Sequence, residues 1–196
     1  MIPPPPRHRF YLIQAVTTSR VILAGSFALV HLTMDQGAAR LVIALVLLGL
    51  GEITDLLDGM LARRWRQVSR WGQMFDPYAD SVSRIIVYWA LACSGTCLAL
   101  VPLVMALRDI TVVYARVVLA QHGRSIAAAW AGKAKAVAQA LGAFILVLGP
   151  LHWELTGTWT IHLWSWLVIV LTALSVVPYV TRAAMAAREG MTDPTG

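Results

Sequence analysis

The sequence predicts an all-α membrane protein with six transmembrane helices and both termini in the cytoplasm. Of its 196 residues, 58% are hydrophobic and only 13% are charged, and the mean hydropathy is +0.67. This composition lies outside the range of ordinary soluble domains. Because a membrane-crossing helix takes about 20 residues, the chain has room for about six helices and none for a separate soluble domain.

The helices are expected in six apolar segments separated by turn-forming residues. The segments lie at 12–34, 37–64, 70–96, 98–121, 126–150 and 160–187. The turns include Met34 to Gly37, Ser94 to Thr96, Gln121 to Gly123, and Gly149-Pro150, where the longest loop is predicted to open. We therefore expect one six-helix transmembrane domain at 12–187 and a short tail at 188–196.

The first 11 residues are predicted to form an extended or amphipathic arm at the membrane surface. Prolines at positions 3–6 prevent a regular helix there, and Arg7, His8 and Arg9 follow them. The first apolar segment is interrupted by polar residues and lacks a convincing cleavage site, so no cleavable signal is expected.

The distribution of basic residues predicts the orientation in the membrane. They lie at the amino terminus, in alternate connections and at the carboxyl terminus: Arg7, Arg9, Arg63, Arg64, Arg66, Arg70, Arg124, Arg182 and Arg188. The opposite side has only Arg40 near a helix end, so the positive-inside rule places both termini in the cytoplasm. Anionic lipid beside the cytoplasmic loops explains the net charge of +6 without any nucleic acid partner.

Four aspartates interrupt the apolar pattern: Asp55, Asp58, Asp76 and Asp80. Carboxylates at membrane depth are costly and normally mark function. The first two are roughly 60° apart around one helix, and the last two roughly 40° apart around the next. The connection from Trp65 to Ser69 is short and favours antiparallel neighbours, so the two acidic faces are expected to meet near the cytoplasmic surface.

The aspartates predict a divalent metal site. Four hard oxygen donors without His or Cys favour Mg²⁺ or Mn²⁺ over zinc or copper, and they suffice for two ions that share ligands. Gly59, Ala62 and Gly72 leave room beside them for a bulky ligand, although small residues also allow close helix packing. Arg63 offers planar donors for a phosphate.

The pattern D-x2-D-G-x2-A-R-x8-G-x3-D-x3-D over residues 55–80 resembles the signature of the CDP-alcohol phosphotransferase (phosphatidyltransferase) family. The resemblance implies transfer of a phosphatidyl group from CDP-diacylglycerol to an alcohol, with release of CMP. It also implies a homodimer. We expect a bacterial-type inner or cell membrane, and the positive-inside orientation places the active site toward the cytoplasm. By this resemblance Asp55, Asp58 and Asp76 hold metal, Asp80 completes a second metal site and acts as general base, and the CDP pocket is lined by Gly59, Ala62, Arg63 and Gly72.

A second run resembles the phosphatidylglycerophosphate synthases, which carry R-E or R-D, then L-R, then W-x-G-K-x-K-T-x-x-Q. Here Arg108-Asp109 and Arg116 are followed by a block from Trp130 to Gln139. Guanidinium and ammonium groups suit an anionic, water-soluble phosphorylated acceptor such as glycerol 3-phosphate. The predicted acceptor-binding residues are Arg108, Arg116, Lys133 and Lys135.

The chain departs from the synthase pattern at three places. Ser81 stands where the pattern has Lys, and Ala136 stands where it has Thr. The family's first-helix pattern N-x-x-T-x-x-R has Gln14 in place of Asn, while Thr17 and Arg20 are present and are expected to reach the nucleotide or lipid phosphates. Inositol, inositol phosphate, serine and phosphatidylglycerol therefore remain alternative acceptors.

A metal or proton transporter is the alternative from another class, because buried carboxylates also line ion pathways. The acids are concentrated at one connection, however, and the far half of the membrane has almost no ionisable residues. A purely structural helix bundle would not retain four acids that repel one another. An enzyme remains the favoured interpretation.

Overall fold

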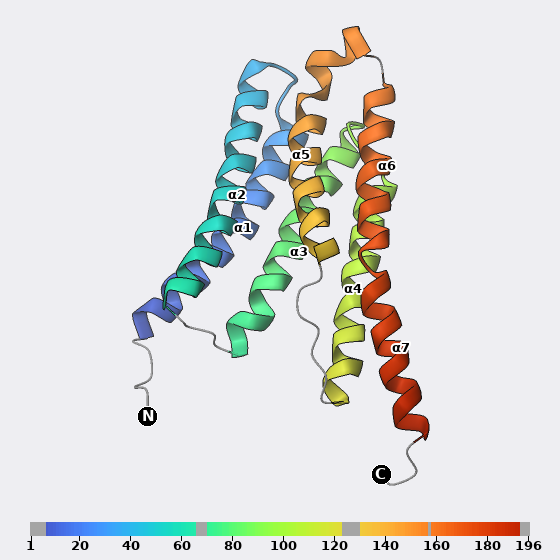
Figure 1. Cartoon of the computed structure of the whole chain (residues 1–196). Coiled ribbons are helices and arrows are strands. Elements are labelled where there is room, and N and C mark those ends of the chain that lie inside the picture. Colours follow the sequence, from blue (N-terminus) through green and yellow to red (C-terminus); the bar gives the residue numbers. More distant parts are fainter. Residues whose placement is uncertain (1–6, 66–69, 123–129, 157, 193–196) are drawn as a thin grey trace.

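The computed structural model describes residues 7–65, 70–122, 130–156 and 158–192, and all regular secondary structure in these ranges is helical. The helices, shown in Figure 1, are α1 (Arg7–Thr33), α2 (Ala38–Trp65), α3 (Arg70–Cys93), α4 (Leu100–Gln121), α5 (Trp130–Thr156), α6 (Trp159–Leu174) and α7 (Val177–Thr192). The predicted all-α class is confirmed, and the predicted turns before α2 and after α3 are present.

Two predicted boundaries were wrong at prolines. α5 continues through Pro150 to Thr156, although a loop was predicted to open there. A proline removes one helical hydrogen bond, whereas leaving the helix inside a bilayer would expose several backbone groups without partners. The predicted segment 160–187 is divided instead: α6 ends at Leu174, and Pro178 in the first turn of α7 has no N–H to donate to the Leu174 carbonyl.

The first helix begins earlier than predicted. α1 starts at Arg7, so residues 7–11 of the predicted arm are helical. The last proline of the run is at position 6, and no residue from Arg7 onward opposes a helix. The boundary therefore lies where the prolines end.

Three stretches of the described residues are long and apolar enough to cross a membrane: Gln14–Thr33, Ala134–Leu151 and Trp159–Glu189. These helices make the chain an integral membrane protein. The other three predicted spans, α2, α3 and α4, contain the charged residues singled out by the sequence, and charged side chains are costly inside a bilayer. Their passage through the membrane stays a prediction.

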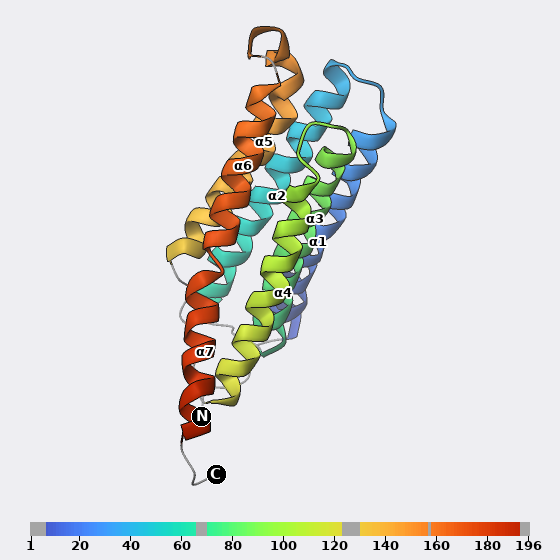
Figure 2. The ribbon, with the colours of Figure 1, turned by 90° about the vertical axis from the view of Figure 1, so that its right-hand side faces the viewer.

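The helices pack into an elongated bundle. α1 lies against α2 and α3, α5 against α6, and α4 against both α6 and α7 (Figures 1 and 2). The core includes Phe27, Tyr88, Leu91, Met105 and Leu146, all essentially buried. The start of α1 and the end of α7 lie at the same end of the bundle (Figure 1). This arrangement agrees with two termini on one side, and which side that is stays a prediction.

Close contact between α3 and α5 depends on Gly142. The buried Tyr88 hydroxyl donates to the Gln139 carbonyl at 2.7 Å. A Cβ atom on Gly142 would lie 2.7 Å from Tyr88 Oη and 3.0 Å from Val168 Cγ2. The glycine therefore leaves the space that the tyrosine occupies.

We expect Gly142→Ala to lower the free energy of unfolding by about 1–3 kcal/mol, because overpacking displaces Tyr88 from its hydrogen bond. The measurement is the melting temperature in detergent micelles. Gly49→Ala is the matched control, because a Cβ there has no atom within 4 Å. A Gly142→Ala protein that melts no lower than the control would contradict the prediction.

Candidate active site

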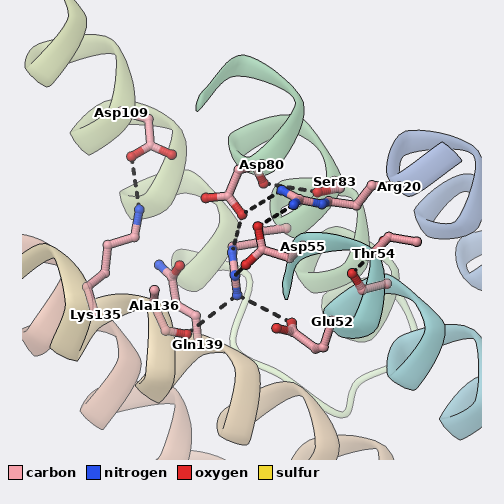
Figure 3. A network of polar contacts seen from close by, with 12 residues as sticks. Arg20, Glu52, Thr54, Asp55, Asp80, Ser83, Asp109, Lys135, Ala136 and Gln139 are labelled. Atoms are coloured by element: carbon pink, nitrogen blue, oxygen red, sulfur yellow. Dashed lines mark hydrogen bonds and ion pairs between the residues drawn. The ribbon is translucent and has the colours of Figure 1, made fainter. Parts of the chain in front are cut away.

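Three helices bring two of the predicted aspartates together around one arginine. Arg20 on α1 donates through Nη2 to Asp55 Oδ1 on α2 and through Nη1 to Asp80 Oδ1 on α3, the latter at 3.3 Å (Figure 3). One turn away on α1, the Thr17 hydroxyl donates to Asp76 Oδ1 at 3.2 Å. The predicted meeting of the two acidic helix faces is confirmed for these described aspartates.

Helical spacing explains the local arrangement. Thr17 and Arg20 are three residues apart on α1, and Asp76 and Asp80 are four apart on α3, so each pair lies on one face of its helix. Because α1 packs against both α2 and α3, its polar face covers the acidic faces of its neighbours. Thr17 and Arg20 are both buried there.

Sequence reasoning missed two residues of this site, Glu52 and Arg84. Arg84 Nε donates to Asp80 Oδ1 at 2.8 Å, and its Nη1 lies 3.5 Å from Glu52 Oε1. Glu52 precedes Asp55 by three residues and Arg84 follows Asp80 by four, so helical spacing alone places each beside a predicted aspartate. That spacing was the available signal.

A cavity of about 50 Å³ lies among these charged groups. Its lining includes Arg20, Glu52, Asp55, Asp80 and Arg84, and the remaining walls are mostly apolar but include Ser83 and Gln139. A water molecule needs about 10–15 Å³ of such space, so the cavity accommodates a few waters or an ion.

The chemistry of the aspartates fits a hard divalent cation. Carboxylate oxygens are the ligands that Mg²⁺ and Mn²⁺ prefer. Among the residues that the structure describes, no three His, Cys, Asp or Glu side chains form a ready-made metal centre. Asp55 and Asp80 are instead neutralised by Arg20 and Arg84. The carboxylate oxygens suit a divalent metal ion, and in this structure the positive charge beside them comes from Arg20 and Arg84.

A second group of charges surrounds Asp109 on α4. Its Oδ1 accepts from Arg108 Nη1 at 2.7 Å and from Lys135 Nζ on α5 at 3.1 Å. Ser81, the residue after Asp80, contacts the same carboxylate from α3. The two groups are therefore adjacent, as Figure 3 shows for Asp80, Asp109 and Lys135. Two predicted acceptor residues, Arg108 and Lys135, bind Asp109, and Lys135 lies on the side of the site next to Asp80.

The third described acceptor residue, Arg116, is placed differently. It is exposed, and its guanidinium lies 5.6 Å from the centroid of the Tyr179 ring on α7. Arg108 approaches the same ring at 5.7 Å while its Nε donates to Ser175 Oγ at 2.9 Å. Tyr179 thus connects Arg116 to the Asp109 group through Arg108.

Several predicted site residues have side chains outside the described part of the structure. α2 carries Asp58, Gly59, Ala62 and Arg63, α3 carries Gly72, and α5 carries Lys133. Their backbone positions agree with the predicted helices. Their roles stay predictions.

Similar proteins identify the family. A model of the CDP-alcohol phosphatidyltransferases matches residues 10–177. Proteins named CDP-diacylglycerol–glycerol-3-phosphate 3-phosphatidyltransferase from Escherichia coli K12, Escherichia coli O157:H7 and Shigella flexneri serotype 5b are each 31% identical to this chain over 191 residues. The match covers 89% of this chain and 96% of each relative. With the geometry of the aspartates, these matches establish that the chain belongs to the CDP-alcohol phosphatidyltransferase family.

Proposed function

We propose that this enzyme transfers the phosphatidyl group of CDP-diacylglycerol to glycerol 3-phosphate, giving phosphatidylglycerophosphate and CMP. One observation carries the proposal: the aspartates of α2 and α3 lie beside the buried cations around Asp109. The aspartates suit displacement at a diphosphate, and the cations suit an acceptor that bears a phosphate. The names of the three relatives describe the same reaction.

Asp80 is proposed as the general base. The acceptor hydroxyl attacks in line the phosphorus that bears diacylglycerol, and its proton passes to the Asp80 carboxylate. A new P–O bond forms, while the bond from that phosphorus to the bridging oxygen breaks and CMP leaves with both electrons. Arg20 and Arg84 hold Asp80 Oδ1, so the carboxylate is oriented before the acceptor arrives.

Two divalent cations, Mg²⁺ or Mn²⁺, are proposed at Asp55, Asp58, Asp76 and Asp80. When bound, they supply neutralisation of the charge on the bridging and leaving phosphate oxygens. The all-oxygen donor set and the family membership support this assignment. The nucleotide is proposed to lie against Gly59, Ala62, Arg63 and Gly72, with Thr17 and Arg20 reaching its phosphates.

The acceptor phosphate is proposed to bind at Arg108 and Lys135, with Lys133 and Arg116 adding positive charge. Arg108 and Lys135 both bind Asp109, which orients them but also competes with the phosphate for their donors. A phosphate dianion supplies more acceptor oxygens than one carboxylate, so it can share these donors with Asp109. Ser81 leaves this part of the site with one cation fewer than the synthase pattern.

The site is proposed to face the cytoplasm of a bacterial inner membrane, in a homodimer. The basic residues near the termini and connections support the orientation. A site at the membrane surface lets the diacylglycerol tails of the donor stay in lipid while the acceptor arrives from water. The dimer is supported by the family membership alone.

The test is release of CMP by purified protein supplied with CDP-diacylglycerol and Mg²⁺. We expect turnover with glycerol 3-phosphate and much less with inositol, inositol phosphate, serine or phosphatidylglycerol, because the Asp109 cations favour a small phosphate ester. Higher turnover with another alcohol would reassign the acceptor and keep the reaction class. If no acceptor releases CMP while liposomes containing the protein take up metal, the transporter alternative holds instead.

A further inference from the structure

We propose that Arg84 is a positioning residue that holds the general base in register with the acceptor-binding helix; this inference rests on the reaction proposed above. Arg84 lies on α3, one turn beyond Asp80, and its side chain is only 12% exposed. It belongs to none of the residue sets assigned to metal, nucleotide or acceptor. A buried guanidinium in an apolar chain is costly, so its contacts need a reason.

The three guanidinium nitrogens of Arg84 each face protein oxygen atoms. Nε donates to Asp80 Oδ1 at 2.8 Å, Nη2 lies 4.0 Å from Asp55 Oδ2, and Nη1 lies 3.5 Å both from Glu52 Oε1 and from the Ala136 carbonyl oxygen. These partners belong to α2, α3 and α5. One side chain therefore joins three helices, and the engagement of all three nitrogens favours positioning over substrate binding.

The contact with Ala136 connects the base to the acceptor site. Ala136 directly follows Lys135 on α5, and Lys135 is one of the proposed phosphate-binding residues. Because Nη1 contacts the Ala136 carbonyl while Nε contacts Asp80, Arg84 sets the separation between the bound acceptor and its base (Figure 3 shows Asp80, Lys135 and Ala136). A misplacement of about 1 Å at such a site costs about 100-fold in rate.

Glu52 is a third carboxylate beside Arg84, after Asp80 and Asp55. It offsets part of the positive charge that Arg84 brings to the two aspartates. The Arg84 side chain is 12% exposed and that of Glu52 is 40% exposed, so removing Arg84 leaves a partly buried carboxylate without this cation and destabilises the fold. Glu52 is thus an ion-pair partner of Arg84. Neutralising both residues is expected to disturb folding less than neutralising Arg84 alone.

The shape of arginine is part of the proposal. A guanidinium is a planar fork that reaches oxygens in several directions, whereas the lysine ammonium is a single point charge. Arg84→Lys therefore keeps the charge but loses simultaneous contact with Asp80 and Ala136. Arg84→Gln removes the charge as well.

The experiment measures kcat and both KM values of these two variants, using CDP-diacylglycerol and the alcohol that the wild type converts best. Rates are normalised to folded protein. We expect kcat to fall about 100-fold and KM for the acceptor to rise, while KM for CDP-diacylglycerol stays at the wild-type value. A residue with a merely structural role would reduce the yield of folded protein and leave the kinetics of the folded fraction unchanged.

Arg182→Gln is the control, because Arg182 is an exposed arginine of α7 that belongs to none of the proposed site residues. If Arg84→Gln does not fold, the double variant Glu52→Gln/Arg84→Gln replaces it and is expected to fold with the same kinetic defect. Wild-type kcat and acceptor KM in Arg84→Lys or in the double variant would overturn the positioning role alone. A wild type that converts no alcohol would overturn the proposed function and this role together.

Discussion

Asp80→Asn is expected to abolish CMP release, with kcat falling by about 100- to 10,000-fold, while the protein still inserts and folds. An amide cannot take the proton of the acceptor hydroxyl, and loss of a general base typically costs this much. Asn has nearly the size of Asp, and its carbonyl oxygen can still accept from Arg20 or Arg84. The measurement is CMP release per folded molecule, together with the melting temperature.

Asp35→Asn is the matched control for Asp80→Asn. Asp35 is exposed in the turn between α1 and α2, at the end of the bundle away from the chain termini (Figure 1). The same chemical change there is expected to leave turnover unaffected. Near-normal turnover in Asp80→Asn would remove the base assignment.

Lys135→Met is expected to raise KM for glycerol 3-phosphate by about 10- to 100-fold and to leave KM for CDP-diacylglycerol unchanged. A hydrogen bond to a charged group contributes about 1.5–3 kcal/mol, which sets this range. Lys135 is buried and lies 3.1 Å from Asp109 Oδ1, at the side of the site next to Asp80. Asp109 retains Arg108 in the variant, so the carboxylate keeps a partner.

Arg116→Gln tests whether position in the fold, rather than charge, decides the effect. Arg116 was predicted from the sequence with the same role as Lys135, but it is exposed and stacks on Tyr179. An exposed charge contributes about 0.2–1 kcal/mol, so we expect at most about a fivefold rise in acceptor KM. If the acceptor KM rises equally in Arg116→Gln and Lys135→Met, the prediction that the buried cation matters more than the exposed one is contradicted.

Much of the fold follows from the order of apolar segments. Apolar runs and turn-forming residues can be recognised directly along the chain, so the segments and the turns at Met34 to Gly37 and Ser94 to Thr96 were predictable. Gly95 indeed has a φ of 75°, which glycine adopts readily. The outcome at Pro150 and Pro178 was not predictable, because it depends on which surrounding groups satisfy or oppose the backbone.

The sequence predicted those parts of the site that lie on one face of a single helix. The spacing of Asp76 and Asp80 places both on one side of α3 in any context. Thr17 and Arg20 were assigned to phosphates, and the structure adds that they already bind aspartates. The four-residue spacing from Asp80 was enough to place Arg84 beside that aspartate, but its contact with the Ala136 carbonyl on α5 depends on helix packing, which no side-chain pattern displays.

The sequence by itself determined the class of fold, the family and the positions of the motif aspartates. These depend on local periodicity and on motif spacing, which any single helix retains. Only the tertiary structure decided which cations face which acids. Arg108 and Lys135 share Asp109 while Arg116 does not, and Arg84 joins three helices. The reason is physical: helix pairing sets distances between residues far apart in the chain, and the strength of a charge contact depends on that distance and on burial.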